Sequence, residues 1–186
     1  MESPGAALST HGDAGSAKQE IRVPSTTNAK YRMLTTEGDY RQACDTVIGV
    51  AQREILIFDR NLFALRLGDP TRIERLTDFL KADGTRRIRI VLHDPDDLEK
   101  NVPRLVQMLA RYSHAVEVRQ SPDNLRHLAD THLLADEGHG VRRFQFDLPR
   151  SALVLDDPAY ISPWRLRFDE LWALSLPCLK INTAGL

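Results

Sequence analysis

Apolar positions recur along the chain from residue 31 onward with two alternating periods, so helices and strands are expected to alternate. Residues 36–51 carry apolar side chains at helical spacing on one stripe: Tyr40, Ala43, Cys44, Val47, Ile48 and Ala51. Thr36, with Asp39 three residues later, forms a variant of the capping box and predicts the start of this helix. The compact apolar run Glu54–Asp59 has the length of a strand and the composition of a central one.

The same alternation continues toward the end of the chain. A second helix is expected from Asp69-Pro70, because proline at the first helical turn loses no hydrogen bond, and a third helical stretch is expected to break before Pro103. The remaining predicted elements are strands at 31–36, 86–94, 115–120 and 151–155, a hairpin within 128–146 and a closing helix at 158–175. This order predicts an α/β fold, a sandwich with a mixed sheet flanked by helices, because crossovers give parallel strand pairs and the hairpin gives an antiparallel one.

The first 29 residues differ in composition from the rest. They are rich in serine, alanine, glycine and threonine and have few large apolar side chains, which is typical of a disordered segment. We therefore expect a disordered N-terminal extension at 1–29 and one domain at 30–186, since 186 residues are enough for a single substantial core. The sequence shows neither the pattern of a signal peptide nor an apolar run of transmembrane length.

The net charge and the cysteine content make several classes of function less favoured for this protein. The formal net charge is -1, so no overall field draws the protein to nucleic acid or to an anionic membrane, and we expect no strong nucleic-acid signal. The two cysteines follow no disulfide or zinc pattern, which favours a reducing cytoplasm. No cofactor is expected.

The stretch 128–146 carries the candidate chemistry. Side chains alternate faces along a strand, so Asp130 and His132 are expected to be neighbours on one face. His132 has the residue type of a nucleophile or general base, and Asp130 is placed to orient it. A structural histidine that pairs with Asp130 is the simpler alternative. A metal alternative, which suits zinc or another divalent ion but matches no local metal motif, groups four residues: His93, Asp94, Asp130 and His132.

Three stretches resemble the phospholipase D superfamily, whose domains carry a strand with the motif His-x-Lys-x4-Asp, followed by a hairpin strand and a late helix. Residues 43–59 (ACDTVIGVAQREILIFD) are similar to the family's first helix and strand. Residues 131–143 (THLLADEGHGVRR) are similar to the motif strand and hairpin, and residues 164–175 (WRLRFDELWALS) to the closing helix. The resemblance implies a phospholipase D-like domain over nearly all of the chain after the extension.

The motif itself departs from the family pattern. One register places Asp130, His132 and Glu137 at the His, Lys and Asp positions, and a second register places His132, Leu134 and His139 there. The first register is preferred, because it aligns the apolar residues after His132 with the family's apolar run. Neither register keeps the lysine.

The resemblance also carries expectations about function. The family builds its active site from two motif copies and this chain has one, so a homodimer is expected. The missing lysine favours a non-catalytic binding or assembly module. The first alternative is a phosphodiesterase or phospholipase D-type hydrolase with Asp130, His132 and Glu137 as catalytic residues, and the second is a divalent-metal-binding protein. A phosphate-containing ligand would bind at Arg142 and Arg143, the nearest cations in sequence.

Overall fold

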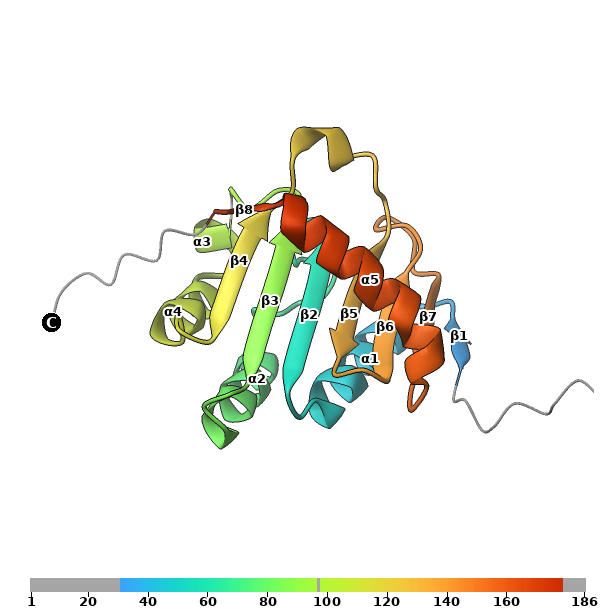
Figure 1. The fold of residues 1–186 in the computed structure, drawn as a ribbon, viewed down its shortest axis with the longest axis horizontal. Helices are drawn as coiled ribbons and strands as arrows, with labels where there is room; N and C mark the ends of the chain where they lie inside the picture. The colour runs from blue at the N-terminus through green and yellow to red at the C-terminus, as the bar shows by residue number, and fades with distance from the viewer. Residues whose placement is uncertain (1–30, 97, 179–186) are drawn as a thin grey trace, which may run out of the picture.

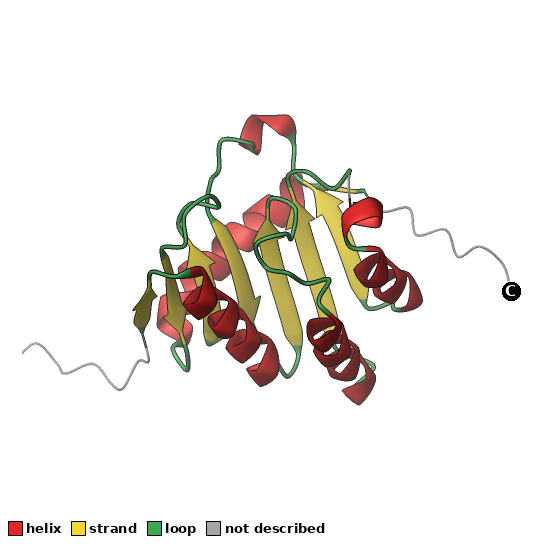
Figure 2. Ribbon diagram, turned by 180° about the vertical axis from the view of Figure 1, so that it is seen from behind, coloured by secondary structure: helices red, strands yellow, loops and turns green. Residues whose placement is uncertain are grey.

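The computed structural model describes residues 31–96 and 98–178, which form one eight-stranded mixed sheet with helices on both faces (Figures 1 and 2). The strands are β1 Arg32–Leu34, β2 Glu54–Asp59, β3 Arg87–Leu92, β4 Val116–Gln120, β5 Thr131–Ala135, β6 His139–Arg143, β7 Ser151–Val154 and β8 Leu176–Pro177. The helices are α1 Glu37–Val50, α2 Pro70–Ala82, α3 Leu98–Asn101, α4 Pro103–Arg111 and α5 Pro158–Leu174, with a 3-10 turn at Asp123–Leu125. The extension expected at 1–29 lies outside the described residues.

The sheet has a parallel half and an antiparallel half that meet at β2, in the order β1-β7-β6-β5-β2-β3-β4-β8. β2 pairs with β3, and β3 with β4, in parallel, as helical crossovers between these strands require. On its other side β2 pairs antiparallel with β5, with Phe58 opposite His132. The hairpin β5–β6 and then β7 and β1 continue the antiparallel half. The predicted mixed sheet flanked by helices is confirmed.

The helices cover the two faces unequally. α1, α2 and α4 lie on one face, while α5 is the one described helix that crosses the other face (Figures 1 and 2). The alternating side chains of β2 divide accordingly, since Ile55 and Ile57 join the core on the α1 side and Leu56 and Phe58 join the core under α5. Because β2 is covered on both faces, all four side chains between Glu54 and Asp59 are apolar.

Local sequence signals set the helix ends where they were expected. Thr36 Oγ1 accepts the backbone N–H of Asp39 at the start of α1, and Pro103 begins α4 after a break at Val102. The strand β8 has no counterpart in the sequence prediction, because two residues are too few to carry a period. Among the helices that the structure describes, none has the length and apolar character needed to cross a membrane.

The topology brings several segments to one edge of the sheet. The parallel strands β2 and β3 both end there, with Asp59 and Leu92, and the antiparallel strand β5 begins there just after Asp130. Ligands of open α/β sheets usually bind at the carboxyl ends of parallel strands. This edge is therefore where a site is expected.

Candidate functional site

The motif-like strand β5 presents alternate side chains to the two faces of the sheet, as expected. His132 and Leu134 face α5, whereas Leu133 joins the core on the α1 side. Asp130 precedes the strand and meets Arg167, which projects from α5. The structure therefore brings Asp130 and His132 together under α5, close enough for the carboxylate to act on the ring electrostatically.

His132 is enclosed by aromatic rings. Only 1% of the residue is exposed, and its ring centroid lies 5.4 Å from that of Phe58 and 6.1 Å from that of Phe168. Neither ring nitrogen has a hydrogen-bond partner within the described part of the chain. Burial lowers the pKa of His132 to about 3, against the opposite effect of the Asp130 charge, so the ring is neutral at neutral pH.

Asp130 is held by two arginines. Its Oδ1 accepts a hydrogen bond from Arg167 Nη2 at 2.6 Å, and its Oδ2 forms an ion pair with Arg142 Nη2 at 3.0 Å. Burial raises the pKa of the Asp130 carboxyl, but the hydrogen bond and charge of Arg167, together with the charge of Arg142, hold it below its usual value. Both carboxylate oxygens are therefore engaged by arginine rather than by His132.

The two candidate phosphate-binding residues lie on opposite faces of β6. Arg142 faces α5, where it pairs with Asp130. Arg143 faces α1, is 3% exposed and pairs with Glu37 at 2.5 Å, with its guanidinium over the ring of Tyr40. Consecutive residues of a strand alternate faces, so the two guanidinium groups do not form one cluster.

Glu137 lies apart from Asp130 and His132. It occupies the turn between β5 and β6, at the far end of β5 from Asp130, and a strand of this length spans about 17 Å. Its exposed carboxylate pairs with Arg53 at 2.9 Å. The structure therefore does not bring Glu137 to the other two residues of the preferred register.

Sequence reasoning missed Asp136, the residue before Glu137. Its backbone adopts the left-handed conformation (φ 52°), which aspartate tolerates better than most residues, and this tolerance is the sequence signal that could have identified it. Its carboxylate accepts the backbone N–H groups, at 2.7–3.0 Å, of the residues that lead into β2: Gln52, Arg53 and Glu54. Asp136 thus ties the hairpin turn to the α1–β2 connection.

Asp136→Ala is expected to lower the free energy of unfolding by about 2 kcal/mol, because three backbone N–H groups lose their acceptor. Asp136→Asn keeps the oxygen that serves Arg53 and Glu54 and tolerates the left-handed conformation, so its cost should stay under about 1 kcal/mol. Urea unfolding followed by circular dichroism measures both variants. Equal losses in the two would contradict the acceptor role.

His93 is tied to neighbouring loops rather than directed at Asp130. Its Nδ1 lies 2.6 Å from Ser121 Oγ, and its Nε2 lies 3.1 Å from the carbonyl oxygen of Leu128. Since a carbonyl only accepts, Nε2 carries the proton and the Ser121 hydroxyl donates to Nδ1. The described ranges contain no group of three or more His, Cys, Asp or Glu side chains that could hold a metal ion, so the metal alternative finds no ligand set there.

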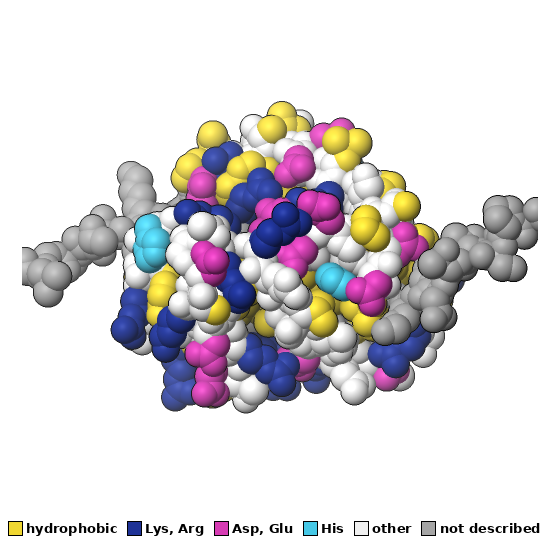
Figure 3. Space-filling view, turned by 60° about the horizontal axis from the view of Figure 1, so that its bottom comes forward, with side chains coloured by type: hydrophobic (Ala, Val, Ile, Leu, Met, Phe, Trp, Pro, Cys, Tyr) yellow, Lys and Arg dark blue, Asp and Glu magenta, His cyan; other side chains and the backbone are white. Residues whose placement is uncertain are grey.

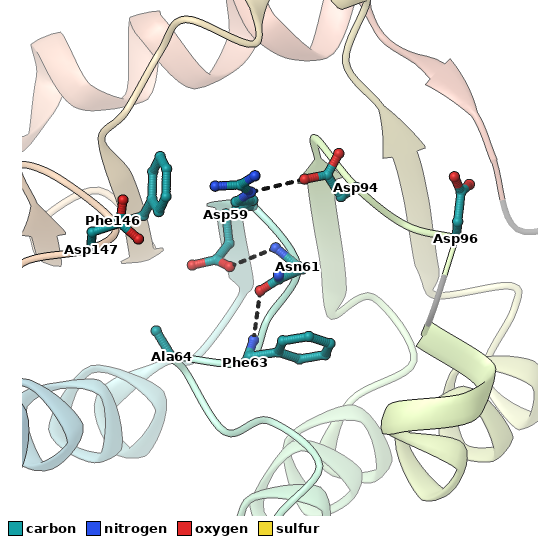
Figure 4. A pocket seen from close by; sticks show the side chains of 9 residues that line it. Asp59, Asn61, Phe63, Ala64, Asp94, Asp96, Phe146 and Asp147 are labelled. Carbon is teal, nitrogen blue, oxygen red and sulfur yellow. Dashed lines mark hydrogen bonds and ion pairs between the residues drawn. The ribbon is translucent and has the colours of Figure 1, made fainter.

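A pocket of about 520 Å³ opens at the same edge of the sheet, beside the ends of β2 and β3 (Figure 4). Four carboxylates contribute to its lining: Asp59, Asp94, Asp96 and Asp147. Its other side chains include one cation and two aromatic rings: Arg60, Phe63 and Phe146. The spacing of these residues along the sequence did not predict that they line one pocket.

Solved structures with similar folds include several phospholipase D-like proteins. The chain resembles TrmBL2, an archaeal chromatin protein whose structure shows a novel mode of DNA binding (TM-score 0.59, 17% identity, 86% of this chain and 57% of that chain). It also resembles the phospholipase D family member Nuc from Salmonella typhimurium (TM-score 0.58, 13% identity, 81% of this chain and 98% of that chain). A third is the phosphatidylserine synthase of Haemophilus influenzae (TM-score 0.57, 12% identity, 85% of this chain and 41% of that chain).

These similarities establish the fold. The chain spans little more than half of TrmBL2 and less than half of the synthase, and all three identities are under 20%. The expected phospholipase D-like fold is confirmed by them. No curated protein matches the chain in sequence. A family profile described as a domain of unknown function, DUF7931, matches residues 36–183, and the chain therefore belongs to this family, with a phospholipase D-like fold.

Proposed function

We propose that this domain is a non-catalytic phospholipase D-like module that binds a ligand or partner as a homodimer. The observation that carries the proposal is the enclosure of His132 between Phe58 and Phe168. A nucleophile must reach the reacting phosphorus, and a general base must reach the proton that it removes, at hydrogen-bond distance. An enclosed imidazole whose two nitrogens make no hydrogen bond to residues 31–96 or 98–178 meets neither requirement.

The charges around the motif strand support the same proposal. A phosphoryl group in transfer carries negative charge that the protein must neutralise with cations. Arg142 and Arg167 share Asp130, and Arg143 pairs with Glu37. Each of these guanidinium groups is already bound to a carboxylate, which weakens its attraction for a phosphate.

A third register of the motif points in the same direction. The spacing His-x-Lys-x4-Asp also fits Ala129, Thr131 and Asp136, in that order. In this register the acid of the motif is Asp136. Its carboxylate accepts the backbone N–H groups that lead into β2, so its role in this chain is structural. Alanine and threonine replace the nucleophile and the cation, and neither can perform their chemistry.

Hydrolysis of a chromogenic phosphodiester tests the proposal. We expect no hydrolysis above the buffer rate, for the wild type or for His132→Leu, which replaces the ring by an apolar side chain of similar size. Hydrolysis that is lost in a folded His132→Leu variant would establish the hydrolase alternative instead. Light scattering on the same sample checks the homodimer, and a strict monomer would argue against both the dimer and an active site built from two motif copies.

DNA binding is a second candidate, which the similarity to the DNA-binding protein TrmBL2 favours against the expectation of no strong nucleic-acid signal. Sequence-independent binding to DNA needs clustered cations that displace counterions from the phosphates. On the face shown in Figure 3, Lys and Arg side chains are interspersed with Asp and Glu. Titration of the protein into a labelled duplex at two salt concentrations tests this candidate. DNA binding through phosphate contacts should weaken as the salt concentration rises.

A further inference from the structure

We propose that the pocket at the ends of β2 and β3 binds a small organic cation, a primary ammonium or guanidinium group on an aliphatic chain. The inference rests on the proposed function and deepens it by naming a ligand class for the module. The pocket's volume of about 520 Å³ falls within the range of small-ligand sites. Its central group is the carboxylate of Asp59.

Asp59 is buried, yet half of its carboxylate has no partner. The residue ends β2 and is 2% exposed. Its Oδ1 accepts the backbone N–H groups of Asn61 and Leu62 at 3.0 and 2.7 Å, whereas Oδ2 has no hydrogen-bond partner in the described chain and points away from Asn61, toward the side of the pocket where Ala64 and Asp147 lie (Figure 4). An unpaired buried carboxylate oxygen lowers the stability of the fold, so its presence at a pocket wall points to a ligand that donates to it.

The remaining charges leave the pocket negative. Asp94 pairs with both Arg60 and Arg126 at 2.9 Å, and Arg126 also pairs with Asp123 at 2.9 Å, so these two arginines and two carboxylates balance one another. Asp96 and Asp147 also line the pocket, and neither has an ion-pair partner among the residues that the structure describes. Together with the central carboxylate they attract a cation and repel a phosphate.

The pocket wall already binds one organic cation from the chain itself. The guanidinium of Arg60 lies 4.5 Å from the ring centroid of Phe146, while its Nε donates to Asp94 Oδ2 at 2.9 Å. An aromatic face and a carboxylate together hold this cation. A ligand would find the same two kinds of group in Asp59 and the exposed ring of Phe63.

The arrangement suits an organic cation better than a metal ion. In the described ranges no three acidic, histidine or cysteine side chains come close enough together to coordinate a metal. The carboxylates are instead distributed around a wide pocket that also contains aromatic rings. Such a lining fits a charged head with an apolar stem, as in an alkylammonium.

Two sources present this chemistry: a free diamine and a lysine side chain of a partner protein. Isothermal titration of the full-length chain with 1,4-diaminobutane, and separately with Nα-acetyl-lysine methylamide, measures binding of each. Tighter binding of the blocked lysine would identify a protein side chain as the source, and tighter binding of the diamine would identify a free amine. Either result supports the site, provided that the variants below respond as expected.

Asp59→Asn is the decisive variant, because it keeps the oxygen that holds the Asn61–Leu62 turn and removes the charge at the pocket. We expect it to weaken amine binding at least about tenfold. Asp78→Asn removes an exposed carboxylate of α2 and should change the affinity less than about twofold. Phe63→Leu should weaken binding about threefold, through loss of the exposed aromatic face, and keeps the test valid if Asp59→Asn fails to fold.

Several outcomes would overturn the cation site. Equal affinity in wild type and folded Asp59→Asn, or no binding of either amine, removes it while leaving the non-catalytic proposal intact, since phosphodiester turnover tests the absence of catalysis separately. Displacement of the diamine by an equal concentration of Ca²⁺ would replace the organic cation by a metal. Binding of inorganic phosphate that competes with the diamine would show that the pocket selects anions.

Discussion

His132→Leu is expected to make the domain much more resistant to acid than the wild type. His132 has a pKa of about 3 in the folded chain and about 6.5 in the unfolded chain. Between these values the unfolded chain binds more protons, so the stability of the wild type falls as the pH drops from 6.5 toward 3. Each pH unit in this window is worth about 1.4 kcal/mol, which gives a loss of about 3 kcal/mol at pH 4. Leucine does not titrate and removes this part of the loss.

The same substitution should also stabilise the domain at neutral pH. Both ring nitrogens of His132 are buried without partners in the described chain, and an apolar side chain of similar size needs none. We expect the free energy of unfolding to rise by about 1 kcal/mol at pH 7. Urea unfolding at pH 7 and pH 4 measures both effects, with His127→Gln, the loss of an exposed histidine, as the matched control. Parallel profiles for the wild type and His132→Leu would contradict a neutral, enclosed ring.

Asp130→Asn is expected to lower the free energy of unfolding at pH 7 by about 2 kcal/mol. The substitution removes the negative charge between Arg142 and Arg167 and leaves two partly buried guanidinium groups near each other without a counter-ion. The loss is smaller than for a fully buried pair, because the side chains of the two arginines are 29% and 33% exposed and water screens part of the interaction.

Asp130 contributes to the free energy of unfolding over a different pH range from His132, and this range lies at lower pH. The pKa of the folded Asp130 carboxyl is below the unfolded value of about 3.9, so its stabilisation is complete above that value and is lost as the pH falls through the folded pKa. The wild type and Asp130→Asn should therefore differ fully at pH 5 and converge in strong acid.

The matched control for Asp130→Asn is Asp169→Asn, whose half-exposed carboxylate meets Arg89 at 3.4 Å. It should cost less than about 0.5 kcal/mol. Urea unfolding at pH 5 and pH 3 compares the three proteins. An Asp130→Asn variant as stable as the wild type at pH 5 would contradict a stabilising role for the Asp130 ion pairs.

Elements with strong apolar periods were predictable from the sequence. The strand at Glu54–Asp59 has its predicted bounds, because a strand covered on both faces has an apolar centre, and here an acidic residue stands at each end of it. The cap at Thr36 was equally predictable, since it depends on residues three positions apart. The shared face of Asp130 and His132 followed from strand alternation alone.

The pocket was not predictable, because its residues are close in space and distant in sequence. Asp59, Asp94 and Phe146 belong to three segments that only the pairing of β2 with β3 and with β5 brings to one edge. The spacing of these residues along the chain does not indicate that they lie close together in the fold. Glu137 is the opposite case. The spacing of the motif predicted that it lies beside His132, but it lies in the β5–β6 turn and pairs with Arg53.

The pairing of β1 with β7 has a consequence for how the chain folds. Arg32 lies opposite Leu153, so β1, the first strand that the structure describes, pairs with a strand about 120 residues later. Contacts between such distant residues slow folding, because the entropy of closing the loop is lost before the pairing energy is gained. The strands β2, β3 and β4 follow one another along the chain and can pair first during synthesis. The β1–β7 pair can form only after β7 has left the ribosome, so β1 stays unpaired with β7 until then.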